Sequence, residues 1–100
     1  MSQIALPAQL DGDQAAALLP QLRRQIEAQA SAPVVLDAAA IQRFDSATLA
    51  LLLECRRLTQ SRQQVLELRN LPAGMLSMAH VYGVDGLLGL PVSAAADELA

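Results

Sequence analysis

The side chains best placed to do chemistry gather in residues 43–48, directly before a run of leucine and alanine at residues 49–53. Asp45, Ser46 and Thr48 each carry an oxygen that can accept from the free N–H groups of a first helical turn, so we expect a helix to begin here. A hydroxyl at the positive end of a helix would also tolerate an added phosphate. The segment is therefore predicted to be a switch or a docking point centred on Ser46.

The composition argues against several kinds of reactive site. The sequence contains no lysine, which removes the Walker-type phosphate loop and Schiff-base chemistry. Cys55 is the only cysteine, so it has no partner for an internal disulfide. Because His80 is the only histidine, the chain also has too few ligands for a zinc site. We expect Cys55 to be a small buried residue or an inert thiol, and we expect no catalytic residues, no cofactor and no metal.

The charge and hydropathy of the chain limit which partners and which cellular location are expected. The formal net charge is −3 and only 2% of the residues are aromatic, so neither a basic patch nor a stacking surface for nucleic acid is indicated. No apolar run is long enough to cross a bilayer, and the N-terminus lacks a basic segment followed by an apolar one. The expectation that follows is a reduced, cytoplasmic location.

Strand-like and helix-like patterns alternate along the chain. Apolar periodicity, prolines and turn residues predict helices near residues 14–30, 46–60 and 72–82, and strands near 3–6, 34–36, 64–68 and 87–90. Within the first helical region, Pro20 either kinks a helix or stands in the first turn of its main part, and we favour the second reading. Gly83 is placed to end the last helix in a left-handed conformation.

This alternation predicts an α/β fold in which residues 1–100 form a single domain, with a small mixed β-sheet and helices packed on it. Residues 34–36 are a continuous apolar run, which is typical of a central strand buried on both faces. Residues 37–44 should form a loop, with Ile41 and Phe44 attaching it to the core.

The local sequence resembles the STAS domain family, the fold of the anti-sigma factor antagonists. The resemblance rests on residues 34–37, a short loop, and then residues 44–49 leading into an apolar helix. In that family a serine following an acid is phosphorylated by a partner kinase, and Ser46 after Asp45 matches this pair. Thr48 departs from the pattern, because it stands where the family usually has glycine, the residue that leaves room for close backbone approach.

A narrower resemblance is to the small STAS subunits of Mla-type phospholipid ABC transporters, carried mainly by residues 45–53, with weaker support from residues 10–20 and 79–83. It implies a non-catalytic subunit that binds and regulates the transporter's cytoplasmic ATPase, reaching the inner membrane only through that partner. The expected contact residues are Arg43, Asp45, Ser46, Ala47, Thr48, Leu49 and Arg56. We expect Ser46 and Thr48 to be partly exposed, and Thr48→Arg to break the complex without unfolding the chain.

Two other functions stay open. The chain could be an anti-sigma factor antagonist that is switched by phosphorylation of Ser46, whose phosphate would add about −1.5 to −2 charges to a docking face. It could also bind a small apolar molecule within its Leu- and Met-rich core, although no convergent polar groups are evident that would orient such a ligand. Whether Ser46 is a docking point or a switch, Ser46→Ala is expected to cost about 0.5–2 kcal/mol as a lost helix cap.

Overall fold

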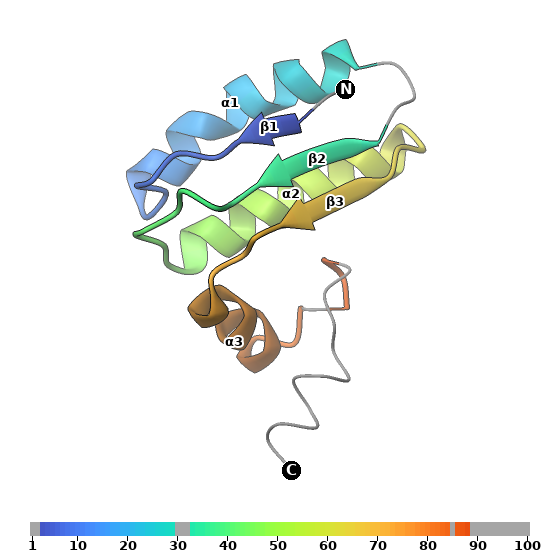
Figure 1. Ribbon diagram of the computed structural model, residues 1–100. Helices are drawn as coiled ribbons and strands as arrows, with labels where there is room; N and C mark the ends of the chain where they lie inside the picture. The colour runs from blue at the N-terminus through green and yellow to red at the C-terminus, as the bar shows by residue number, and fades with distance from the viewer. Residues whose placement is uncertain (1–2, 30–32, 85, 89–100) are drawn as a thin grey trace.

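A computed structural model of the chain describes residues 3–29, 33–84 and 86–88 (Figure 1). In chain order the elements are β1 (Gln3–Ala5), α1 (Asp13–Ala28), β2 (Val34–Asp37), α2 (Ser46–Ser61), β3 (Leu66–Arg69) and α3 (Ala73–Val81). The predicted positions of three helices and of the first three strands are therefore confirmed to within a few residues.

The three strands form one sheet in the order β1-β2-β3, so β2 is central, as predicted. Both pairings are parallel: Ile4 lies opposite Leu36, and Leu36 lies opposite Leu68. Each crossover between parallel strands carries a helix, which is the arrangement that parallel neighbours require. The described strands are all parallel, so no antiparallel member of a mixed sheet lies among these residues.

Within residues 3–29, 33–84 and 86–88, helices cover one face of this sheet and leave the other without a helix (Figure 1). In Figure 1, α1 and α2 both lie behind the strands. Val34 and Leu36 point toward the helices and are fully buried, whereas Val35 on the opposite face is only half-buried. The prediction that this strand is buried on both faces is therefore wrong, because an apolar run does not reveal that one face lacks a covering layer.

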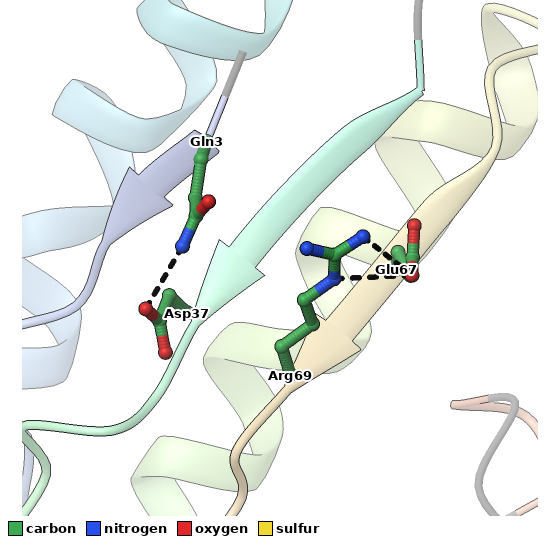
Figure 2. A network of polar contacts seen from close by, with 4 residues as sticks. All are labelled: Gln3, Asp37, Glu67 and Arg69. Atoms are coloured by element: carbon green, nitrogen blue, oxygen red, sulfur yellow. Dashed lines mark hydrogen bonds and ion pairs between the residues drawn. The ribbon is translucent and has the colours of Figure 1, made fainter. Parts of the chain in front are cut away.

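The uncovered face carries a polar network instead of an apolar layer (Figure 2). The Gln3 amide donates to the Asp37 carboxylate at 2.9 Å, and the Asn70 amide donates to it at 2.9 Å from beyond the end of β3. On β3 itself, Arg69 pairs with Glu67 at 3.1 Å. The bonds from Asn70, the Ala39 amide and Gln3, with the nearby charge of Arg69, together lower the pKa of Asp37.

The core lies between the sheet and the two long helices. Its largest fully buried side chains come from every layer: Leu6, Leu10, Leu22, Ile26, Val34, Leu36, Leu52 and Met75. The third helix attaches through its buried Met75 and Ala79, and through Gly74, where an added Cβ would lie 2.9 Å from the Phe44 ring. Phe44 packs against the core, as predicted, and its ring also contacts α3 at Gly74. Helix α3 lies beyond the carboxyl end of β3 (Figure 1).

Two boundary predictions need correction. Helix α1 runs unbroken from Asp13 with Pro20 inside it, so Pro20 does not open a new helix. Leu87 and Leu88 lie in a turn and not in a strand, while the rest of the predicted last strand falls outside the described residues. Gly83 does adopt a left-handed φ of 71°, as predicted for the residue that ends α3.

Candidate functional site

The start of α2 is fixed by two side chains that bond each other's backbone. Asp45 is the N-cap, and its carboxylate accepts from the Ala47 amide at 2.9 Å. In return, the Asp45 amide donates to the Thr48 hydroxyl at 3.0 Å. This reciprocal arrangement satisfies donors that the first helical turn leaves free, which explains why the helix begins at Ser46.

The same two side chains also bind the segment that leads into α1. The Gly12 amide donates to both Asp45 carboxylate oxygens, at 3.0 and 3.2 Å. The Thr48 hydroxyl donates to the Leu10 carbonyl at 2.6 Å. Gly12 has a φ of 52°, a left-handed conformation that glycine adopts without steric cost. The beginnings of α1 and α2 are thus bonded together at one end of the helix layer.

Ser46 differs from its neighbours because its side chain is exposed and has no hydrogen bond within the described part of the chain. It occupies the first turn of α2, but Asp45 provides the cap. The prediction that Ser46 is a capping residue is therefore wrong, whereas its predicted exposure is confirmed.

Thr48 is fully buried, with 0% of its surface exposed, and Leu49 is 4% exposed. The prediction that Thr48 is partly exposed is wrong, because its hydroxyl turns inward to reach Leu10. An arginine in place of Thr48 would bury an unpaired charge, so Thr48→Arg is now expected to unfold the chain and cannot serve as a binding test.

The remaining predicted contact residues, Arg43 and Arg56, lie before and beyond the first turn of α2. Arg43 is exposed, and its backbone is held beside the first loop by a bond from its amide to the Ala8 carbonyl at 3.0 Å. Arg56 is half-buried further along α2, and its Nε is buried without a hydrogen-bond partner. The structure therefore brings Asp45, Ser46 and Ala47 together but does not place Arg56 with them.

Two apolar hollows flank the outward side of α2. The first, about 220 Å³, lies between α1 and α2, and its lining residues are Ala15, Ala16, Leu19, Ala47, Ala50, Leu51 and Glu54. The second, about 310 Å³, lies between α2 and the end of α3, and it is lined by Ser46, Leu49, Ala50, Leu53, Tyr82 and Val84. Ala50 belongs to both linings and is exposed, so it forms the ridge between the two hollows.

We call this the α2 docking face: the two hollows and the ridge at Ala50 between them, with Ser46 in the lining of the second hollow. Tyr82, which lines the second hollow, is 58% exposed, and the adjacent Val81 at the end of α3 is 78% exposed. The contact residues expected from the sequence did not include Ala16, Ala50 or Tyr82. The available signal was the recurrence of alanine on both long helices, since small side chains leave space between helices that pack side by side.

The chemistry this face offers is apolar contact with a few polar groups at its edge. Glu54 borders the first hollow and pairs with Arg57 at 3.0 Å on the surface. Cys55 lies beneath in the core, where burial raises the pKa of its thiol to about 11, as expected for an inert thiol. Among the described residues, no group of three or more His, Cys, Asp or Glu side chains is arranged to hold a metal ion.

Within the described ranges, none of the helices has the length and apolar character needed to cross a membrane. Comparison with family models matches residues 1–89 to the family described as "Mlab, STAS domain". No curated protein matches the chain.

Proposed function

The chain belongs to the MlaB-type STAS domain family, and from this premise we propose that it is a non-catalytic subunit of an Mla-type phospholipid ABC transporter. In this role it binds the transporter's cytoplasmic ATPase through the α2 docking face and regulates it. The transporter would then maintain the lipid asymmetry of the outer membrane, and the chain would reach the inner membrane only through this partner.

The observation that carries the proposal is the exposed apolar character of the α2 docking face. Ala50 on the ridge and Ala47 in the first hollow have short side chains that allow a partner to approach the α2 backbone closely, and the two hollows can each accept an apolar side chain. Tyr82 of the second hollow and the adjacent Val81 are strongly exposed, although a free domain gains nothing by exposing them to water. A surface of this kind favours a protein partner, whose binding can shift the ATPase between conformations by a coupling free energy.

The test uses two substitutions of exposed alanines by arginine. Ala50→Arg places a long charged side chain on the ridge, so the affinity for the purified ATPase subunit should fall at least about tenfold, a typical size for loss of a central contact. Ala28→Arg, at the last residue of α1, is the matched control and should bind like the parent. If Ala50→Arg binds the ATPase as tightly as Ala28→Arg, the docking face lies elsewhere.

A second candidate function is supported by Ser46. Its hydroxyl is exposed in the first turn of α2, where backbone N–H groups favour an added phosphate. An anti-sigma factor antagonist would use this serine as its switch. In that case Ser46→Ala should abolish a kinase-dependent response, whereas a docking subunit should keep binding the ATPase after the same substitution.

A further inference from the structure

Asp45 and Thr48 connect α2 to the segment before α1 through side-chain bonds to Gly12 and Leu10. We call these four residues the latch. We propose that Thr48, with Asp45, is a positioning residue that sets how α1 lies against α2 and therefore shapes the first hollow, without touching the partner. The part of this inference that concerns partner binding rests on the proposed function, whereas the part that concerns helix geometry does not.

The bonding of Thr48 leaves nothing for a partner to contact. Its side chain is 0% exposed, its hydroxyl hydrogen is donated to Leu10, and its oxygen accepts from the Asp45 amide. A hydroxyl that both donates and accepts within the protein is satisfied without a further ligand. Removing it would leave the Leu10 carbonyl without this donor in a buried position, so the chain would shift to recover a bond.

The position of the latch relative to the first hollow explains why such a shift would affect binding. One wall of the hollow comes from Ala15, Ala16 and Leu19 of α1, and the opposite wall from Ala47, Ala50 and Leu51 of α2. The latch lies at the end where both helices begin. Four of these six wall residues are alanines, whose side chains are too short to adjust, so a movement of α1 changes the shape of the hollow.

The chain contains a matched control for this hydroxyl. Thr59 is also on α2 and is also 0% exposed, but its hydroxyl donates to the Arg56 carbonyl within the same helix, at 2.9 Å. Replacing either threonine by valine removes one buried hydroxyl at nearly constant shape. Only Thr48→Val breaks a bond between α2 and another segment of the chain. A general loss of stability would therefore affect both variants, whereas a positioning role predicts that only Thr48→Val changes the helix distance and the binding.

The experiment measures geometry and binding in parallel. Spin labels on cysteines replacing the exposed Gln14 of α1 and Gln60 of α2, in a Cys55→Ala background, report the distance between the helices by double electron–electron resonance. Thr48→Val should shift or broaden this distance and weaken ATPase binding by roughly tenfold, within the range of measured couplings. Thr48→Ser keeps the hydroxyl and should restore both readings, and Thr59→Val should match the parent in both.

The proposal is overturned if Thr48→Val weakens binding at an unchanged distance, because Thr48 would then act on the partner in another way. It is equally overturned if Thr48→Val leaves binding unchanged. A parent chain that never binds the ATPase defeats the proposed function, while the distance measurement still decides whether the latch sets the geometry. Should Thr48→Val fail to fold, Asp45→Asn, which weakens the acceptor for the Gly12 amide, takes its place with the same criteria.

Discussion

At the scale of single residues, the neighbours Asp45 and Ser46 have opposite roles. Asp45 caps α2 and accepts the Gly12 amide, whereas Ser46 is exposed and has no hydrogen bond among the described residues. Asp45→Ala should lower the free energy of unfolding by about 1–3 kcal/mol, because the cap bond from Ala47 and the bond from Gly12 are lost together. Ser46→Ala should change it by less than about 0.5 kcal/mol, as for other surface substitutions. Urea denaturation of both variants measures the difference, and equal losses would contradict the assigned roles.

The thiol of Cys55 gives a prediction about pH. Desolvation in the core raises its pKa to about 11, so the neutral thiol persists through the physiological range. Since the thiolate is the reactive form, the folded chain should react with a thiol reagent at pH 8 far more slowly than the chain in denaturant. Absorbance of the released chromophore gives both rates. Comparable rates would mean that Cys55 is accessible in the folded state.

The sequence predicted the start of α2 but not the direction in which its side chains point. Capping residues before an apolar run indicate a helix start whatever surrounds them. Whether Thr48 faces solvent depends on the Leu10 carbonyl, which is brought beside it only by the fold. The same limit applies to Arg56, which is half-buried further along α2 and has an Nε without a hydrogen-bond partner.

At the scale of elements, substitutions in β2 give the clearest test that helices cover one face of the sheet and not the other. Leu36 is fully buried under the helices, and Val35 on the other face is half-buried. Leu36→Ala should destabilise the chain by about 2–5 kcal/mol, as core truncations do. Val35→Ala should cost clearly less, because it leaves no enclosed cavity. Thermal and urea denaturation of the pair would contradict this architecture if Val35→Ala were as costly as Leu36→Ala.

The polar network on the uncovered face predicts an acid dependence. The folded-state pKa of Asp37 is lowered below 3.8, chiefly by the bond from Asn70, so its ionised form favours the folded chain. That contribution is present at neutral pH and is lost as the pH falls below about 3.8 toward the lowered value. Asp37→Asn should therefore show less loss of stability over this acid range than the parent. Identical acid-denaturation profiles would show that the network contributes nothing.

The predicted and observed structures differ in the features that depend on tertiary contacts. Periodicity and turn residues located α1, α2 and α3, since local patterns determine where helices form. The uncovered face of β2 and the hollows beside Ala50 depend on which elements pack together, which no local pattern states. Pro20 is tolerated within α1 because the helix packs on the core through Leu22 and Ile26, beyond the proline.

At the scale of the whole molecule, the structure separates two surfaces of different character. The sheet presents Gln3, Asp37, Glu67 and Arg69 to solvent (Figure 2), whereas the α2 docking face on the helix layer presents alanine, leucine and tyrosine. A polar surface whose charges already pair internally gains little from a partner. The apolar face loses contact with water when a partner covers it, so the proposed ATPase interaction belongs there.

The most direct test of this account is the ATPase rate of a reconstituted Mla-type transporter titrated with the purified chain. We predict a saturable change in the rate with the parent, an equal change with Ser46→Ala and with Ala28→Arg, and no change with folded Ala50→Arg at matched concentrations. A rate unaffected by the parent, or a response that needs a kinase and disappears in Ser46→Ala, would contradict the account.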